Sequence, residues 1–164
     1  MNNILQVTKD VSQKKEIVRF SDIVNDIKAS LNTTISKEKA IFILDFSAVD
    51  EMLTLKGYMY SIFYNLISNG LKYHQPGIPA IIEIKSSKQN DKIELLFKDN
   101  GIGIDLKKKG EQVFMLYKRF HPQVAEGKGI GLYMVKSQVE SLGGKISVES
   151  EVNKGTIFII EFET

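Results

Sequence analysis

The chain of 164 residues carries a formal net charge of +2, with 43% hydrophobic and 26% charged residues. This length is enough for one domain with its own core, and the small charge gives no argument for a nucleic acid or a membrane surface as partner. The chain has no cysteine and two histidines, His74 and His121, which excludes disulfides and thiol catalysis and leaves too few ligands for a histidine–cysteine zinc site.

The first half of the chain predicts two helices and a strand. Apolar residues at helical spacing, after a capping Ser21, predict a helix over 21–31. The run AIFILDF at 40–46 predicts a short buried strand. A long helix is predicted over 54–73, and the proline-containing loop 74–80 ends it.

The second half of the chain does not alternate strictly between helices and strands. In order, it predicts a strand pair over 80–100, a short helix over 109–120, an aperiodic and mobile segment over 121–129, a helix over 130–142 ended by Gly143–Gly144, and two final strands joined by the turn EVNKG. This order favours an α+β fold: a two-layer α/β sandwich with a mixed, mostly antiparallel sheet and helices on one face. We expect residues 18–164 to form this domain and residues 1–17 to form an N-terminal tail.

The long helix carries a narrow polar stripe. At about 100° per residue, Ser61, Asn65, Asn69 and Lys72 fall on one side of it. A solvated face explains the position, but such a face would favour Glu, Lys or Gln because Asn is a poor helix former. Two amide oxygens on one side suit a hard cation such as Mg²⁺ together with phosphate oxygens, and Lys72 can reach a phosphate.

The segment KDNGIGID at 98–105 follows a predicted strand. The sequence Asp-Asn-Gly is typical of a tight turn. It also allows a second interpretation, in which Gly101 and Gly103 let the backbone approach a ligand and Asp99 accepts a hydrogen bond from an amino group.

The segment EGKGIGLYMVK at 126–136 places glycines at alternate positions where a helix begins. It is either a flexible loop at a helix boundary or an anion site, because free amides and the helix dipole both favour negative charge there. The spacing matches neither the dinucleotide-binding fingerprint nor a P-loop.

In this order, the motifs resemble the ATP-binding catalytic domain of sensor histidine kinases, which shares a superfamily with gyrase-type, Hsp90-type and MutL-type ATPases. NLISNGLKY (65–73) is similar to the family's asparagine box and DNGIGI (99–104) to its first glycine box. VFMLYKRF (113–120) resembles the phenylalanine box and GKGIGLYMVK (127–136) the second glycine box. The resemblance covers residues 18–163 and implies a Bergerat-type ATP-binding fold.

The resemblance implies a site for Mg²⁺ and the phosphates of ATP. Asn69 would coordinate the Mg²⁺ that bridges the phosphates, and Asn65 would assist. Lys72 would contact phosphate, and Arg119, with Lys118, would lie near the terminal phosphate. The catalytic residues implied in this way are Asn65, Lys72 and Arg119.

The same resemblance implies how the base is held. Tyr73 would pack beside adenine, and Asp99 would accept from the exocyclic amine, which selects adenine over guanine. Gly101 and Gly103 would admit the base, and Thr156 would help to close its pocket. The residues that would hinge a lid and present amides to phosphate are Gly127, Gly129 and Gly131.

One residue distinguishes transfer from hydrolysis within this superfamily. In the hydrolytic relatives a glutamate stands one helical turn before the metal-binding asparagine and activates water. Here Asn65 takes that place, and its amide cannot accept a proton. The resemblance therefore implies phosphoryl transfer to a protein acceptor, where catalysis is mostly positioning and charge neutralisation.

No histidine occurs before His74, so the helical hairpin that carries the family's phosphoacceptor histidine is missing from this sequence. Residues 1–17 look at most like the end of that hairpin. We expect a cytoplasmic domain that binds ATP and Mg²⁺, does not phosphorylate itself, and donates the γ-phosphoryl group to the hairpin of its parent kinase. A response regulator is the indirect partner, and no contact with nucleic acid or membrane is expected, even where the parent protein is membrane-anchored.

Three other interpretations stay open. The chain is alternatively a non-catalytic module that binds ATP and docks on a partner, or an anti-sigma-type serine kinase on the same fold. In a third interpretation it is a structural domain whose glycines only make turns.

Overall fold

The computed structural model describes residues 14–109, 113–114 and 131–164, and a five-stranded mixed sheet lies at its centre. In spatial order the strands are β2 (Ile41–Asp45), β4 (Ile81–Gln89), β5 (Lys92–Asp99), β7 (Gly155–Glu163) and β6 (Lys145–Glu151). β2 runs parallel to β4, and the other neighbours are antiparallel. The predicted strand pair over 80–100 and the two final strands are confirmed.

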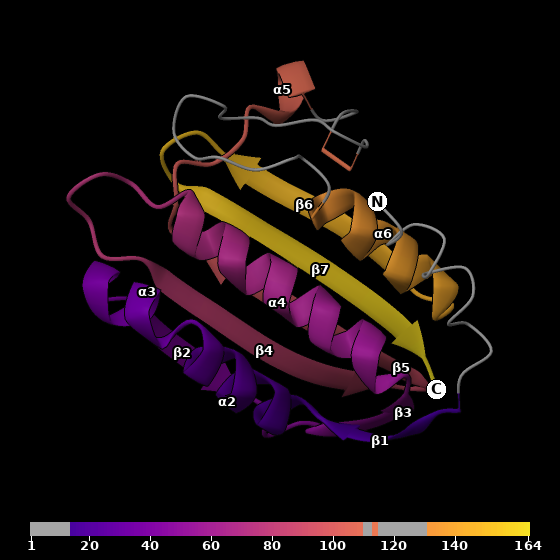
Figure 1. Ribbon diagram of the computed structural model, residues 1–164. Helices are drawn as coiled ribbons and strands as arrows, with labels where there is room; N and C mark the ends of the chain where they lie inside the picture. The colour runs from indigo at the N-terminus through magenta and orange to yellow at the C-terminus, as the bar shows by residue number, and fades with distance from the viewer. Residues whose placement is uncertain (1–13, 110–112, 115–130) are drawn as a thin grey trace.

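Helices α2 (Phe20–Ser30), α4 (Lys56–Lys72) and α6 (Gly131–Ser141) lie on one face of this sheet (Figure 1). The predicted helices over 21–31, 54–73 and 130–142 are confirmed except for their end residues, as is the α+β class with helices on one face. Two short helices were not predicted, α3 (Asn32–Glu38) and α5 (Leu106–Lys109). Most of the predicted helix over 109–120 lies outside the described residues, and no helix within them is long and apolar enough to cross a membrane.

The core lies between the helices and the sheet because alternate strand residues point to the helical layer. The buried apolar residues of the three central strands are Ile82, Ile84, Ile93, Leu95, Phe97, Phe158, Ile160 and Phe162. Phe63 of α4 meets Phe97 edge to face at 4.9 Å between ring centroids, and it stacks on Phe20 of α2 at 5.9 Å. Burying each such side chain contributes about 1.5–3 kcal/mol. This packing fixes α4 on the sheet.

A second, two-stranded sheet is formed by β1 (Glu16–Arg19) and β3 (Glu51–Thr54). Val18 and Met52 lie opposite each other and are buried against the main core. Ile17 and Leu53 form the neighbouring pair, and both are exposed. Neither strand was predicted, because four residues carry too little alternation to be recognised without the partner strand.

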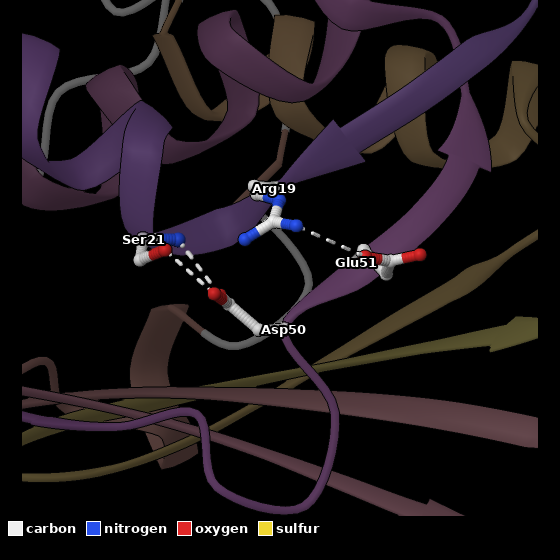
Figure 2. Close-up of polar contacts among 4 residues, drawn as sticks. All are labelled: Arg19, Ser21, Asp50 and Glu51. Carbon is white, nitrogen blue, oxygen red and sulfur yellow. Dashed lines mark hydrogen bonds and ion pairs between the residues drawn. The ribbon is translucent and has the colours of Figure 1, made fainter.

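The start of α2 corrects the expectation that Ser21 caps this helix. Arg19 precedes the first helical residue and makes no side-chain capping bond. Instead, Asp50 reaches the helix from the segment before β3: its Oδ1 accepts the Ser21 N–H at 2.9 Å and its Oδ2 accepts the Ser21 hydroxyl at 2.6 Å (Figure 2). The neighbouring Arg19–Glu51 ion pair spans 3.9 Å between exposed side chains and contributes little.

β2 corrects the expectation of a buried strand. It forms one edge of the main sheet, and Ile41 and Ile43 are half exposed. The apolar run in the sequence predicts burial, but periodicity does not reveal whether a strand lies in the middle or at the edge of a sheet.

Helix α6 ends at the predicted glycine pair. Gly143 adopts a φ of 80°, in the left-handed region that favours glycine, and the N–H of Gly144 donates to the carbonyl of Val139 at 2.9 Å. This end sets the direction in which β6 begins.

Candidate functional site

A hollow opens between the end of α4, the loop after β5, the start of α6 and the start of β7. Its empty volume is about 410 Å³, counting the solvent at its mouth. The residues that line it are Asn69, Tyr73, Asp99, Gly103, Ile104, Leu132, Thr156 and Phe158. Five of these were proposed as site residues from the sequence, so the asparagine helix and the first glycine segment do share one cavity.

Asp99 is the acidic group of the hollow. It ends β5 opposite Thr156 of β7, and its Oδ1 accepts the N–H of Gly101 at 2.9 Å. Burial raises the pKa of Asp99, and backbone hydrogen bonds from Gly101 and Thr156 offset part of this effect. Keeping this carboxylate ionised is therefore costly, and a ligand that donates a hydrogen bond to it would offset that cost.

Thr156 is oriented by a hydroxyl on the neighbouring strand. Ser150 of β6 lies opposite it, with 2.8 Å between the two side-chain oxygens. Ser150 Oγ accepts the N–H of Ile104 at 2.7 Å and donates to the carbonyl of Gly155 at 2.8 Å. Because Ser150 has a single proton, Thr156 must donate to it, which leaves the lone pairs of Thr156 available to a further donor.

Gln75 holds the loop after β5 in place. Its amide nitrogen lies 2.9 Å from the carbonyl oxygen of Asn100, 3.2 Å from that of Gly101 and 3.1 Å from that of Asn153. Asn153 belongs to the β6–β7 turn, so the Gln75 side chain joins this turn to the loop after β5, whose residues Gly103 and Ile104 line the hollow.

Two further contacts fix the same loop. Ile102 donates its N–H to the carbonyl of Tyr73 at 2.9 Å and accepts the N–H of Asn153 at 2.8 Å. Asn100 accepts the N–H of Ile81 at its Oδ1, at 2.8 Å. The loop is thus tied to the end of α4 and to the start of β4, and it is preorganised.

Glycine is required in this loop because other backbone segments approach it. A Cβ on Gly101 would collide with the carbonyl of Tyr73, and one on Gly103 would collide with the carbonyl of Glu151. Gly103 also has a φ of 75°. On α4, a Cβ on Gly70 would meet the end of the Ile82 side chain, in agreement with close packing of this helix on the sheet.

Asn65 lies one turn before Asn69 on α4. Its amide nitrogen donates to the carbonyl of Ser61 at 2.8 Å. A Cβ on Gly131 would lie 3.0 Å from the amide oxygen of Asn65, so the start of α6 passes close to Asn65. The amide oxygen of Asn65 and the first residue of α6 therefore lie together.

The other proposed residues are less well placed or lie outside the described part of the chain. Lys72 is exposed at the end of α4 and is not among the lining residues. The residues outside the described ranges are Lys118, Arg119, Gly127 and Gly129, together with the proposed lid.

Sequence reasoning missed the apolar walls, which are Ile104, Leu132 and Phe158. Alternation along the last strand would have found Phe158, because it shares a face with Thr156. It also missed Gln75, Asn100 and Ser150, for which the sequence offers no signal, since such residues are common on protein surfaces.

The arrangement suits a flat, mainly apolar group that carries an amino donor. The walls are largely hydrophobic, and the acceptors are the Asp99 carboxylate and the lone pairs of Thr156. Within the described ranges, no three His, Cys, Asp or Glu residues are close enough to hold a metal ion. A cation beside this hollow would have to be held by amide oxygens, such as those of Asn65 and Asn69, together with oxygens of the ligand.

The chain is similar in sequence to known proteins. A family model described as "Histidine kinase-, DNA gyrase B-, and HSP90-like ATPase" matches residues 56–164. The sensor protein SrrB of Staphylococcus aureus (strain MRSA252) is 29% identical over 181 aligned residues, which cover 98% of this chain and 28% of SrrB. The chain spans 20% to 28% of the length of the curated sensor proteins it matches.

Solved structures share the fold. The nucleotide-free catalytic domain of the histidine kinase ThkA superposes with a TM-score of 0.77 at 20% identity, covering 92% of this chain and 96% of that domain. Full-length ShkA in complex with AMPPNP superposes with a TM-score of 0.79 at 17% identity, covering 98% of this chain and 34% of ShkA.

Proposed function

Since the chain belongs to the family of histidine kinase-, DNA gyrase B- and HSP90-like ATPases, we propose that it is the ATP-binding catalytic domain of a sensor histidine kinase. In the proposed reaction, the γ-phosphoryl group is transferred from ATP to an imidazole nitrogen of a histidine on a separate helical hairpin. ADP is the leaving group, and the imidazole loses its proton. The observation that carries the proposal is the buried carboxylate of Asp99 in a hollow with mainly apolar walls.

The hollow is proposed to hold adenine. Asp99 would accept a hydrogen bond from the exocyclic amine, and Thr156 would offer a second acceptor. Tyr73 would pack beside the ring. Gly101 and Gly103 would let the loop after β5 fold closely against the carbonyls of Tyr73 and Glu151, which occupy the space of a side chain at these two positions. Guanine would present a carbonyl oxygen to the carboxylate, and this repulsion would select adenine.

The stretch between Asn69 and the start of α6 is proposed to hold the phosphates and Mg²⁺. Mg²⁺ prefers oxygen ligands and usually shares them between a few protein groups, phosphates and water. Asn69 and Asn65 would supply amide oxygens, and the first amides of α6 would face the phosphates. The further residues proposed to contact the phosphates or close the lid are Lys72, Lys118, Arg119, Gly127, Gly129 and Gly131.

Asn65 supports transfer over hydrolysis. An amide cannot take a proton from water. The amide nitrogen of Asn65 is already engaged as a donor to the carbonyl of Ser61. The domain is therefore expected to hold ATP without hydrolysing it rapidly and to act by positioning the γ-phosphoryl group.

The partners follow from the same reaction. They are ATP, the helical hairpin of the parent kinase and, one step later, a response regulator. We place the domain in the cytoplasm because ATP is found there, whether or not the parent protein is membrane-anchored.

The metal role is tested by calorimetric titration with a non-hydrolysable ATP analogue, with and without Mg²⁺. The wild-type domain should bind more tightly with Mg²⁺, and Asn69→Ala should lose this difference. Ser68→Ala, which changes the neighbouring residue outside the lining of the hollow, is the matched control and should behave as wild type. An Asn69→Ala protein with the full Mg²⁺ dependence would contradict the proposed ligand.

The transfer step is tested with labelled ATP and a separately supplied hairpin that carries a phosphoacceptor histidine. We expect an acid-labile phosphoprotein on the hairpin and no label on this chain. An acid-stable product on a partner would support the serine kinase alternative, and binding of ATP without any transfer would support the non-catalytic module.

A further inference from the structure

Ser150 of β6 lies behind the wall of the hollow and is not among the residues that line it. It is half-buried, on the face of β6 that also carries Ile146 and Val148, and both of these pack against the core. Its hydroxyl contacts two segments that do line the hollow, because Ile104 belongs to the loop after β5 and Thr156 to β7. The hydroxyl of Ser150 therefore connects two walls of the hollow from behind.

The three neighbours of Ser150 Oγ leave one arrangement of protons that satisfies all of them. The N–H of Ile104 can only donate, and the carbonyl of Gly155 can only accept. The single proton of Ser150 therefore goes to the Gly155 carbonyl at 2.8 Å, and the Thr156 hydroxyl donates to Ser150, also at 2.8 Å. In this arrangement the proton and both lone pairs of Ser150 are in use.

The alternative arrangement makes one hydrogen bond fewer. If Ser150 donated to Thr156, the carbonyl of Gly155 would lose this donor, and the Thr156 proton would be free to meet a ligand. One net intramolecular hydrogen bond shifts an equilibrium between two arrangements about three- to tenfold. The first arrangement therefore predominates, and Thr156 faces a ligand as an acceptor.

Asp99 and Thr156 are opposite each other in the register of β5 and β7, and both line the hollow. Opposite residues on one face of antiparallel strands have Cβ atoms about 4.5–5.5 Å apart, so the two side chains offer acceptors to the same edge of a ligand. A donor at this edge leaves the bonds of Ser150 intact. An acceptor at this edge either stays without a partner or takes the Thr156 proton, which costs one hydrogen bond in the wall.

We propose that Ser150 is a positioning residue that makes Thr156 an acceptor and thereby strengthens the selection of a base with an amino group over a base with an acceptor in the same place. This inference rests on the proposed function, in which the hollow holds adenine. The carboxylate of Asp99 supplies one part of the selection. Ser150 supplies a second part of about three- to tenfold, the effect of one net hydrogen bond.

Calorimetric titration with two matched nucleotides tests the proposal. Both are non-hydrolysable triphosphates, one of adenosine and one of a methoxypurine riboside, in which a methoxy oxygen replaces the exocyclic amine and the ring nitrogens are unchanged. Ser150→Ala releases the Thr156 proton, which can then meet the methoxy oxygen. The preference for the adenine nucleotide should fall about three- to tenfold relative to wild type. Ser150→Cys keeps the size of the side chain but offers only a weakly hydrogen-bonding thiol, and it should show a similar fall.

Two further variants of β6 serve as controls. Ser150→Thr retains the hydroxyl and should retain the wild-type preference. Ser147→Ala removes an exposed hydroxyl from the same strand, opposite Ile159 of β7, and should also leave the preference unchanged. Because both affinities are measured on one preparation, a partial loss of folded protein cancels from their ratio. A purely structural role for Ser150 would weaken binding of both nucleotides equally, so an unchanged preference in Ser150→Ala would overturn the proposal.

A double-mutant cycle tests whether Ser150 acts through Thr156. Thr156→Val keeps the shape of the side chain and removes its hydroxyl. In this background Ser150→Ala should no longer change the preference, because no Thr156 proton remains to be released. A further fall of about three- to tenfold in the double variant would mean that Ser150 acts by another route, and it would overturn the proposal.

The same measurements distinguish this proposal from the function on which it rests. A wild-type domain that binds both nucleotides equally would contradict the adenine site itself, and the proposal with it. A wild-type domain that prefers the adenine nucleotide, with the same preference in Ser150→Ala, would overturn the role of Ser150 alone.

Discussion

Asp50 and Asp99 are both carboxylates that accept backbone N–H groups, but they lie in different surroundings. Asp50 accepts two hydrogen bonds from Ser21 at the start of α2, where the helix dipole also favours a negative charge. Asp99 lies in a mainly apolar hollow, and burial raises its pKa. Asp50 therefore stabilises the folded chain, whereas the charge on Asp99 lowers its stability until a ligand donates to it.

The difference separates the frame of the domain from its site. Around Asp50 the chain supplies a hydrogen-bond donor to each of the two carboxylate oxygens. Around Asp99 the partners are incomplete, in the place where a ligand would complete them. Replacing Asp50 should therefore lower the stability of the domain and leave ligand binding unchanged. Replacing Asp99 should weaken ligand binding without lowering stability.

The largest effect is expected from Asp99→Asn. Affinity for a non-hydrolysable ATP analogue should fall about 10- to 100-fold, because a hydrogen bond to a charged group is worth about 1.5–3 kcal/mol. The free energy of unfolding of the ligand-free protein should be equal to or higher than that of wild type. Calorimetry and urea denaturation measure the two quantities, and unchanged affinity would break the proposed role of Asp99.

The converse variant is Asp50→Ala. It should lower the free energy of unfolding by about 1–2 kcal/mol, the usual cost of removing a capping side chain. Its affinity for the ATP analogue should stay close to that of wild type. Ser21→Ala removes one of the two bonds and serves as the control, with a smaller loss; a fully stable Asp50→Ala protein would contradict this account of α2.

A smaller effect is expected from Gln75→Leu. Loss of the amide removes its hydrogen bonds to the loop after β5, which becomes less ordered. Affinity for the ATP analogue should then fall about three- to tenfold, equivalent to about 0.7–1.4 kcal/mol. Gln89→Leu, at the exposed end of β4, is the matched control and should bind as wild type. If both variants bind equally well, Gln75 is dispensable for positioning the loop.

The smallest effect is expected in the pH dependence of stability. Because the folded-state pKa of Asp99 is raised, its contribution to stability is fully present below the ordinary carboxyl pKa and is lost as the pH rises through the raised value. Wild type should therefore lose stability relative to Asp99→Asn over this range of rising pH. Urea denaturation at several pH values measures the free energies of unfolding of both proteins. A wild type that gains stability relative to Asp99→Asn as the pH rises would contradict this prediction.

Sequence patterns predicted the long helices and strands, in which the apolar pattern repeats several times. The helix over 54–73 and the strand pair over 80–100 repeat their apolar positions often enough to be recognised, and both are present. β1, β3 and α3 were missed because they are short and depend on tertiary pairing. β2 was assigned correctly as a strand but wrongly as buried, since its position at the edge depends on the order of strands.

The site divides in the same way. Motif order indicated Asn69, Tyr73, Asp99, Gly103 and Thr156, and these residues lie around one hollow. Gln75 and Ser150 could not be predicted, because their importance comes from the backbone groups they contact. For Gly101 the sequence suggested room for a ligand, whereas the structure shows the carbonyl of Tyr73 beside it.

The central claim is that the hollow around Asp99 binds adenine, and its most direct test is a calorimetric comparison of matched, non-hydrolysable adenine and guanine triphosphates in Mg²⁺. The account predicts that the wild-type domain binds the adenine nucleotide at least about tenfold more tightly and that Asp99→Asn loses most of this preference. Equal affinity of the wild-type domain for both nucleotides, or a preference that survives Asp99→Asn unchanged, would contradict it.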